Sequence, residues 1–388
     1  MKITGIDTFA VDGGARPWHF VAIRTDSSIT GYGEFGESGV THGLQGLVQD
    51  MSSWLIGKDP TPVERLYFDL YRAYRGTPYG VTAWAIAGIE LALWDLKGKA
   101  LGLPVHSVVG GPFREKQRVY WSHLGTYRAR NPELWGAKPL RTWDDVADCA
   151  REAVDKGYTA FKTNILFPGD PSWAITQGRD GKTHDQLAES DIINQAVKQI
   201  SVMRDAVGPQ IDICLDINYN FKTEGAIRLA RALEPYKLFW MEIDNQDPEA
   251  LLQLKTSTRT SITSGEQLVT MRQYQPFFDL RAMDTVKVDV QWQGFGNAKK
   301  VADLAETYEL NIAPHNYNSH LSTFQSLNLC ASVSNVRIME SDPDAIPWKD
   351  ELVTVVPEPK NSYIDIPKGP GWGTDLNEEV AKKHAWNK

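Results

Sequence analysis

The fold is decided by six short apolar runs in the second half of the chain: IDICLD (211–216), LFWME (238–242), SITSGE (261–266), DTVKVD (284–289), LNIAPH (310–315) and VRIME (336–340). Each run closes on one acidic or basic residue, namely Asp216, Glu242, Glu266, Asp289, His315 and Glu340. Successive closing residues are 26, 24, 23, 26 and 25 positions apart. A strand, a loop, a helix and a return loop take about 25 to 30 residues. The spacing therefore predicts consecutive βα units, each with one functional side chain at the carboxyl end of its strand.

Two earlier runs, RVYWSHL (118–124) and TAFKTNI (159–165), bring the predicted strands to eight. Amphipathic segments such as AIRLARALEPY (226–236) separate them, and eight strands alternating with helices indicate a parallel sheet that closes on itself. We therefore predict an α/β fold, a modified (β/α)8 TIM barrel. The spacing doubles between Lys162 and Asp216, and the surplus segment 166–185, rich in Gly, Pro and Asp, is predicted to form a loop over the barrel mouth.

The residues before the barrel predict a second domain. Segments 1–11, 18–26 and 28–37 are strand-like, and VTAWAIAGIELALWDLKGKALG (81–102) is a helix apolar nearly all round, which should be buried. We predict an N-terminal α+β capping domain over residues 1–115 and a catalytic barrel over residues 116–355. The Pro/Gly-rich tail, residues 356–388, is expected to return to the capping domain.

Composition argues against several classes of function. The net charge is −8 and no block is rich in Lys or Arg, so neither a nucleic acid nor a membrane is expected as a partner. Cys149, Cys214 and Cys330 are far apart and odd in number, which argues against a disulfide framework and fits a reducing compartment. The N-terminus lacks the apolar core of a signal peptide, and no stretch is long enough to span a membrane. We expect a soluble cytoplasmic protein.

Asp216, Glu242 and Glu266 end three consecutive predicted strands, so their carboxylates should converge at the barrel mouth. Three converging carboxylates cannot all stay ionised without a strong positive partner. A set of oxygen ligands without thiolate or imidazole suits Mg²⁺ above Mn²⁺. Any one of these acids alone is more simply explained as a helix cap or an ion-pair partner, but three at matched positions favour a metal site.

His315 and Asp289 end neighbouring strands, and a carboxylate bonded to one imidazole nitrogen fixes the tautomer and raises the basicity of the other nitrogen. Lys162 and Asn164 are two positions apart on one strand, so both should face the mouth. A charged Lys162 can hold a substrate carboxylate or a developing enolate oxygen. Glu340 completes the ring and, if protonated, can donate a hydrogen bond to an enediolate. Together with Mg²⁺, these groups suit removal of a proton α to a carboxylate.

The chain resembles the mandelate racemase subgroup of the enolase superfamily over essentially its full length. The resemblance rests on these motifs and the strand-end acids: SITGYGEFGE (28–37), AIAGIELALWDLKGKALGLPVHSVVGG (85–111), AMDTVKVDV (282–290), APHNY (313–317) and PGWGTDLNEE (370–379). It implies a capping domain over a modified barrel, Mg²⁺ held by Asp216, Glu242 and Glu266, an Asp289–His315 dyad as general base, and Glu340 as a partner of the intermediate. The related subgroup with a lysine at the end of the sixth strand is disfavoured, because Asp289 occupies that place.

The chain also departs from the family pattern. Racemases of this family carry Lys-x-Lys on the second strand, whereas this chain has Lys162-Thr-Asn164, and asparagine cannot take and return a proton at neutral pH. Lys-x-Asn is similar to sugar-acid dehydratases such as those acting on galactonate. Those enzymes have a histidine where this chain has Asn218, so the acid that protonates the leaving hydroxide is either His315 or a mouth residue such as His123. Asp244 faces the same way as Glu242 and is expected to support the metal ligands.

Substrate contacts are expected from the capping domain, in the loops 12–19, which contains Trp18 and His19, and 37–42. Arg128 and Arg130, after the first barrel strand, are further candidates. The resemblance implies Mg²⁺-dependent dehydration of an aldonate to a 2-keto-3-deoxy acid by a homo-oligomer. Two rivals stay open: an epimerase, racemase or lactone cycloisomerase using the same enediolate chemistry, and a non-catalytic sugar-acid-binding protein.

Overall fold

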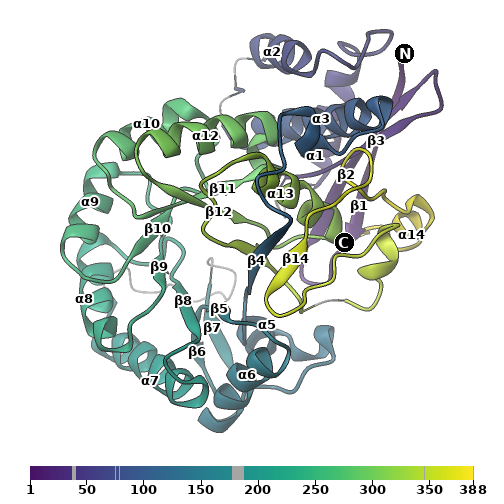
Figure 1. Cartoon of the computed structure of the whole chain (residues 1–388). Coiled ribbons are helices and arrows are strands. Elements are labelled where there is room, and N and C mark those ends of the chain that lie inside the picture. Colours follow the sequence, from purple (N-terminus) through teal and green to yellow (C-terminus); the bar gives the residue numbers. More distant parts are fainter. Residues whose placement is uncertain (37–40, 75, 78, 177–187, 345, 388) are drawn as a thin grey trace.

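The computed structural model describes residues 1–36, 41–74, 76–77, 79–176, 188–344 and 346–387. Eight parallel strands form a nearly closed barrel in the order β12-β11-β10-β9-β8-β5-β4-β13, and a parallel bridge between Ile312 and Val336 lies across the remaining seam. The predicted fold class is confirmed (Figure 1). The barrel strands are β4 (Lys116–Trp121), β5 (Ala160–Thr163), β8 (Asp212–Asp216), β9 (Trp240–Glu242), β10 (Ile262–Ser264), β11 (Thr285–Asp289), β12 (Asn311–His315) and β13 (Met339–Ser341).

The register of the barrel strands brings their carboxyl ends to one level. Asp216 on β8 is the direct partner of Glu242 on β9, and Asp289 on β11 is the direct partner of His315 on β12. Because parallel neighbours hold their side chains side by side, the residues that close these strands meet at a single rim of the barrel.

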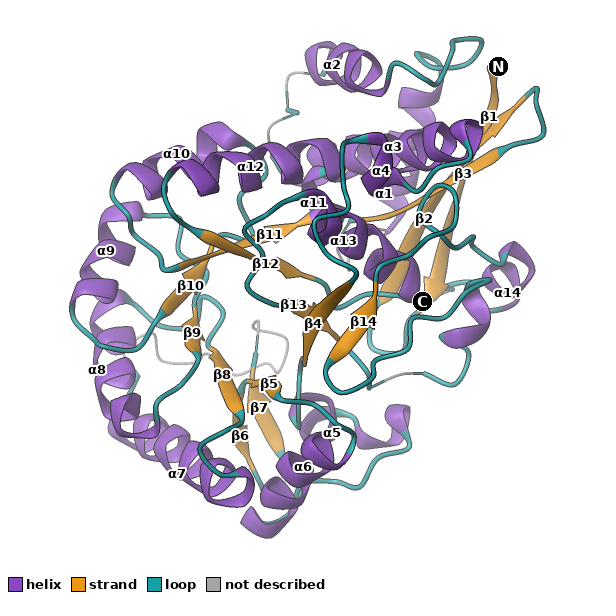
Figure 2. Ribbon diagram, in the orientation of Figure 1, coloured by secondary structure: helices purple, strands orange, loops and turns teal. Residues whose placement is uncertain are grey.

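Helices surround the barrel on the outside (Figure 2). In α8 the residues Ala226, Leu229, Ala230 and Leu233 are buried, which is the spacing of a helix with one apolar face. The N-terminus of α6 is closed by a reciprocal capping box between Thr142 and Asp145. The helices after the barrel strands include α5 (Thr126–Arg130), α6 (Trp143–Asp155), α7 (Ser190–Val207), α8 (Thr223–Leu233), α9 (Pro248–Thr256), α10 (Met271–Asp279), α11 (Val290–Gln293), α12 (Phe295–Thr307) and α13 (His320–Ser332).

The N-terminal part is a three-stranded antiparallel sheet covered by helices. The predicted all-round apolar helix is α3, which is buried along most of its length and ends at Gly102 in the left-handed conformation. Glu90 of α3 accepts hydrogen bonds from the main-chain nitrogens of Phe295 (2.9 Å) and Gly296 (2.8 Å), so it caps α12 and ties this part to the barrel. The elements are β1 (Ile3–Asp12), β2 (Pro17–Thr25), β3 (Thr30–Phe35), α1 (Thr41–Ser52), α2 (Val63–Ala73), α3 (Gly80–Leu101) and α4 (Val105–Val108).

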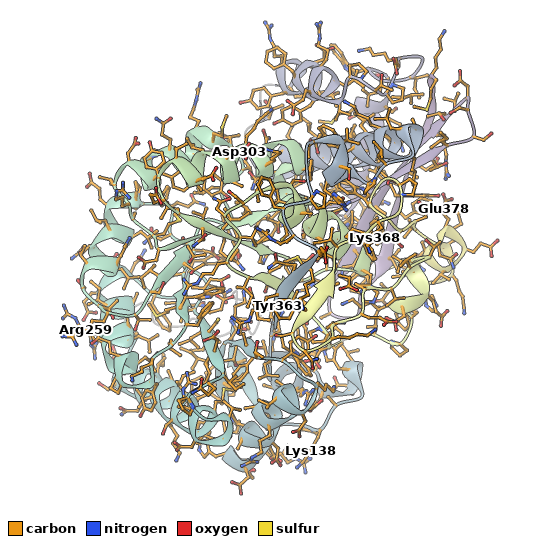
Figure 3. All side chains as sticks on the ribbon, viewed as in Figure 1. Lys138, Arg259, Asp303, Tyr363, Lys368 and Glu378 are labelled. Carbon is orange, nitrogen blue, oxygen red and sulfur yellow. The ribbon has the colours of Figure 1, made fainter. Side chains whose placement is uncertain are left out.

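The C-terminal tail contacts both parts of the molecule. Strand β14 (Tyr363–Asp365) pairs antiparallel with barrel strand β4. Helix α14 (Glu378–Lys383) lies beside the N-terminal sheet, where Glu378 (labelled in Figure 3) accepts a bidentate pair of hydrogen bonds from Arg24 of 2.6 and 2.8 Å. The tail therefore returns to the N-terminal sheet and also adds a strand next to the barrel.

The described part of the predicted mouth loop begins with a small hairpin, in which β6 (Ile165–Phe167) pairs with β7 (Trp173–Ile175). Residues 177–187 of that loop, and residues 37–40 of the second predicted substrate loop, lie outside the described residues. The three cysteines are buried and unpaired, as expected. Among the described helices, none combines the length and apolar character needed to cross a membrane.

Candidate active site

A polar cavity lies at the carboxyl ends of the barrel strands, on the rim where the strand-closing residues meet. Its lining comes from the barrel and from one N-terminal segment, which contributes Arg16. The lining residues are Arg16, His123, Tyr127, Arg130, Lys162, Asn164, Thr176, Asp216, Asn218, Glu266, Trp292, His315 and Tyr317.

Lys162 lies at the buried end of this cavity among three carboxylates. Its Nζ atom is 2.9 Å from Glu242 Oε1, 3.0 Å from Glu340 Oε1 and 3.2 Å from Asp216 Oδ2. Burial alone would lower the pKa of Lys162, but Glu242 and Glu340 outweigh burial and hold this pKa well above its usual range. These three contacts pair the Lys162 ammonium group with carboxylates on three different barrel strands.

Glu266 and Asp244 form the other side of the acidic set. Burial and the neighbouring charge of Asp244 raise the pKa of Glu266 well above its usual value, and burial together with Asp216 and Glu242 raises the pKa of Asp244 to about 8. The Oε2 atom of Glu266 is buried and accepts no hydrogen bond from any described residue. Burying several ionised carboxylates close together costs free energy unless a cation neutralises their charge.

The predicted metal ligands are thus neighbours, but they do not yet form a ligand set. Within the described ranges, no three acidic, His or Cys side chains already surround one point as metal ligands do. Instead, the Lys162 ammonium group contacts two of them, Asp216 and Glu242. The three predicted ligands offer only carboxylate oxygens, which are the ligands that a hard cation such as Mg²⁺ prefers. One of these atoms, Glu266 Oε2, is buried without a hydrogen-bond partner among the described residues. The three side chains would need to adjust to surround one cation. Asp244 does not line the cavity, and its main-chain nitrogen donates to Asn218 O.

His315 and Asp289 form the predicted dyad. His315 Nδ1 lies 2.6 Å from Asp289 Oδ2, and Asp289 Oδ1 accepts a 2.8 Å hydrogen bond from the main-chain nitrogen of Trp292. Burial lowers the pKa of His315 well below its ordinary value, so the imidazole is neutral near pH 7. Asp289 keeps the proton on Nδ1, which leaves the lone pair on Nε2, 3.4 Å from Glu266 Oε2.

Asn164 and Asn218 line the cavity beside this acidic set. Asn164 Nδ2 donates to the main-chain oxygen of Asp216 (2.9 Å) and lies 3.5 Å from Asn218 Oδ1, and Thr126 Oγ1 donates to Asn164 Oδ1. The main-chain nitrogen of Asn218 donates to Asp216 Oδ1 (2.8 Å). Hydrogen bonds therefore fix the Asn164 side chain. In the Lys-x-Lys motif of racemases, this position carries the second base.

Glu340 lies below the cavity and does not line it. It accepts hydrogen bonds from Ser122 Oγ and from Lys287 Nζ (3.1 Å). Burial would raise the pKa of Glu340, but Lys162 and Lys287 outweigh burial and hold this pKa well below its ordinary value. In this arrangement Glu340 contacts Lys162 directly, at 3.0 Å between Oε1 and Nζ.

The structure also places residues that the sequence interpretation missed. Lys287 is fully buried, and its Nζ atom donates a hydrogen bond to Tyr120 Oη (2.9 Å). The sequence could have indicated it, because Lys287 is two residues before Asp289 and therefore on the same face of β11. Arg16 reaches the cavity and donates to the main-chain oxygen of Tyr317 (3.1 Å). Arg16 lies inside the predicted substrate loop 12–19 but was not singled out there, because its partner is 301 positions away in the chain.

Trp18 and His19 do not line the cavity, in contrast to the predicted substrate contacts from this segment. Both belong to β2, where they pair with Val11 and Ala10 of β1. The residue of this segment that does reach the cavity is Arg16. Of the other predicted contacts, His123 and Arg130 line the cavity, whereas Arg128 bonds Glu152 and Asp344.

The comparisons with known proteins agree with this architecture. Residues 13–110 match the family described as the mandelate racemase/muconate lactonizing enzyme N-terminal domain, and residues 145–380 match the family described as enolase C-terminal domain-like. A D-xylonate dehydratase of Haloferax volcanii is 29% identical over 99% of this chain and 89% of its own length. A D-galactonate dehydratase of Ralstonia pickettii is 28% identical over 98% of this chain and 93% of its own length.

A solved structure from Burkholderia xenovorans has a TM-score of 0.95 and 36% identity, and the match covers 99% of this chain and 96% of that one. That protein is provisionally named an L-alanine-DL-glutamate epimerase and was solved with magnesium and fumarate bound. The relatives therefore include both dehydratases and a protein with an epimerase name.

Proposed function

Since this chain belongs to the mandelate racemase/muconate lactonizing enzyme family, we propose that it is a Mg²⁺-dependent dehydratase that converts an aldonate to a 2-keto-3-deoxy acid. The observation that carries this proposal is the buried pair of His315 and Asp289, in a cavity where Asn164 stands at the second-strand position that carries a base in racemases. The relatives named as D-xylonate and D-galactonate dehydratases support the same reaction class.

Asp216, Glu242 and Glu266 are the residues proposed to hold Mg²⁺. Bound there, the cation supplies neutralisation of the acidic set and Lewis-acid stabilisation of the charge that develops on the substrate carboxylate. The Burkholderia xenovorans relative, solved with magnesium and a dicarboxylate, supports a cavity of this kind. Lys162 adds a second, fixed positive charge at the same end of the cavity.

His315 is proposed to take the proton from C2 of the substrate at Nε2. The neutral imidazole has its lone pair on this atom, because Asp289 keeps the other ring proton on Nδ1. Lys162 is placed to stabilise the oxyanions of the resulting enediolate. Loss of the C3 hydroxyl group then gives an enol, which gains a proton at C3 to become the 2-keto-3-deoxy acid.

Epimerisation is the second candidate, and the structural relative with an epimerase name favours it. Inversion at one carbon needs proton donors or acceptors on both faces of that carbon. Lys162 is tied to three carboxylates and Asn164 does not titrate near neutral pH, so the second barrel strand supplies no second base, and the relatives named as dehydratases favour loss of water. We therefore rank dehydration first.

The test is an assay of the purified protein with Mg²⁺ against D-xylonate, D-gluconate, D-galactonate and a panel of C4 to C6 aldonates and aldarates. Formation of a 2-keto acid, measured as its semicarbazone, is the expected result for at least one acid. Deuterium uptake at C2 in D₂O without formation of any keto acid would contradict dehydration and support epimerisation as the function. A panel with neither keto acid nor exchange would contradict both.

A further inference from the structure

We infer that His123, positioned by Asp342, is the general acid that protonates the leaving hydroxyl group, an inference that rests on the proposed dehydration. Loss of the C3 hydroxyl group as water needs a proton on its oxygen. A second histidine–aspartate pair at the same cavity provides it.

The geometry of this second pair parallels that of the first. His123 Nδ1 lies 3.2 Å from Asp342 Oδ2, and Ser122 Oγ is 3.3 Å from the same nitrogen. Asp342 is held in place by a 2.8 Å hydrogen bond from Tyr127 Oη and by Arg16 Nη2 at 3.8 Å. The Nε2 atom of His123 makes no hydrogen bond to any described residue, and the ring lines the cavity.

Ring contacts place His123 next to the first dyad. The Tyr317 ring lies 4.7 Å from the His315 ring and 5.8 Å from the His123 ring, measured between centroids. On its other side, His123 stacks on Tyr127 at 4.7 Å. The two imidazoles thus flank one aromatic ring, so a substrate bound beside that ring can approach both.

Other acids in the described lining are poorly suited. Lys162 is bonded to Glu242 and Glu340 at the buried end of the cavity. Burial raises the pKa of Tyr127 well above its usual value, and its hydroxyl proton is donated to Asp342. Histidine is the side chain that most readily gives up a proton near neutral pH, and the Asp342 carboxylate lies 3.2 Å from Nδ1 of His123. The buried Oδ1 atom of Asp342, which has no partner among the described residues, leaves this carboxylate with unused acceptor capacity.

His315 Nε2 takes the C2 proton, and the electron pair of that bond passes into the carboxylate to form the enediolate. The pair then returns to form the C2–C3 double bond as the C3–O bond breaks. The departing oxygen takes the proton of His123 Nε2 and leaves as water. Tautomerisation of the enol moves its hydroxyl proton to C3 and gives the keto acid. Exchange with solvent then removes the proton from His315 and returns one to His123 for the next cycle.

The best variant is His123→Asn. His123 has a backbone φ of 53°, in the left-handed region, and asparagine is among the few residues that tolerate this conformation. Asparagine can keep a hydrogen bond to Asp342 but carries no acidic proton near neutral pH. The matched control is His384→Gln, because His384 stacks on Trp348 in the tail, outside the described lining of the cavity.

The experiment compares three reactions of the full-length protein with Mg²⁺: dehydration of the acid that the wild type turns over, C2 exchange of that acid in D₂O, and fluoride release from its 3-deoxy-3-fluoro analogue. Fluoride leaves without protonation. In His123→Asn we expect dehydration to fall at least about 100-fold while exchange and fluoride release persist. The control should keep all three reactions.

Two results would overturn the assignment. Dehydration that survives in His123→Asn would show that another group protonates the leaving oxygen. Parallel loss of all three reactions, with an unchanged melting temperature, would show that His123 only binds or orients the substrate. A wild type that dehydrates nothing in the panel is a different result, because it rejects the proposed function before His123 is tested.

Discussion

Nδ1 of His315 and Oδ2 of Asp289 lie 2.6 Å apart, on residues that are direct partners at the ends of neighbouring parallel strands. The other oxygen of Asp289 caps helix α11 through the main-chain nitrogen of Trp292. One carboxylate therefore fixes the start of a helix and the tautomer of the proposed base. The barrel register alone brings the two side chains together.

Replacing Asp289 separates these two roles. Asp289→Asn keeps an oxygen that can cap α11 but cannot stabilise a protonated His315, so kcat should fall by about 100-fold or more with little change in melting temperature. Asp289→Ala should lose as much activity and also about 1 kcal/mol of stability, because the cap is lost. Steady-state kinetics and thermal unfolding of both variants measure this. Equal stability of the two variants would argue against the capping role.

The pH dependence should follow the depressed pKa of His315. Burial lowers this pKa well below the ordinary value of 6.5, and the base must be neutral to accept a proton. Activity should therefore be retained as the pH falls to 6.5 and lost only at lower pH, as His315 becomes protonated. A profile of kcat/KM against pH checks this expectation. An acidic limb centred above pH 6.5 would contradict it.

Metal binding should stabilise the folded protein. Chelation with EDTA should abolish activity, and Mg²⁺ at about 100 times its Kd should restore activity and add about 2.7 kcal/mol to the free energy of unfolding. Glu266→Gln should reduce or remove the stabilisation by Mg²⁺, because it removes a proposed ligand. Thermal unfolding with and without Mg²⁺ measures this independently of activity.

The matched control for that experiment is Glu224→Gln, since Glu224 lies exposed on α8. It should respond to Mg²⁺ as the wild type does. An equal response in Glu266→Gln would remove Glu266 from the proposed ligand set.

Lys287 should matter for stability. Its ammonium group is fully buried and lies 3.1 Å from Glu340 Oε2 and 2.9 Å from Tyr120 Oη. Lys287→Met leaves part of the Glu340 charge uncompensated and should lower the free energy of unfolding by about 3 kcal/mol or more. Adding Glu340→Gln should recover part of this loss. Urea unfolding of the single and double variants measures these free energies. A decrease of only about 0.5 kcal/mol in Lys287→Met, which is typical of surface substitutions, would contradict the expectation.

The strand-closing residues of the site were predictable because the barrel repeats with the sequence. Asp289 and His315 occupy the same position in successive βα units, so the period of the chain predicted that they meet. Lys287 was predictable in principle, because it is two positions before Asp289 on the same strand. A charged side chain inside the barrel was nevertheless unexpected, because burying a charge costs free energy.

Contacts that join distant parts of the chain were not predictable in this way. Arg16 meets Tyr317 across 301 positions, and Asp342 meets Tyr127 across 215. Trp18 and His19 were expected in a substrate loop, but β2 begins at Pro17 and takes both into the sheet. The strand predicted over residues 18–26 is close to β2, and its pairing with β1 keeps both residues out of the cavity lining.

We propose that His315 removes the C2 proton and that water is then lost from the same acid. Its most direct test follows both events by NMR in D₂O, with Mg²⁺ and an aldonate, for the wild type and His315→Asn. We predict that the wild type forms a 2-keto-3-deoxy acid and that the folded variant shows neither keto acid nor exchange at C2. Continued C2 exchange in the variant, or exchange without loss of water in the wild type, would contradict the account.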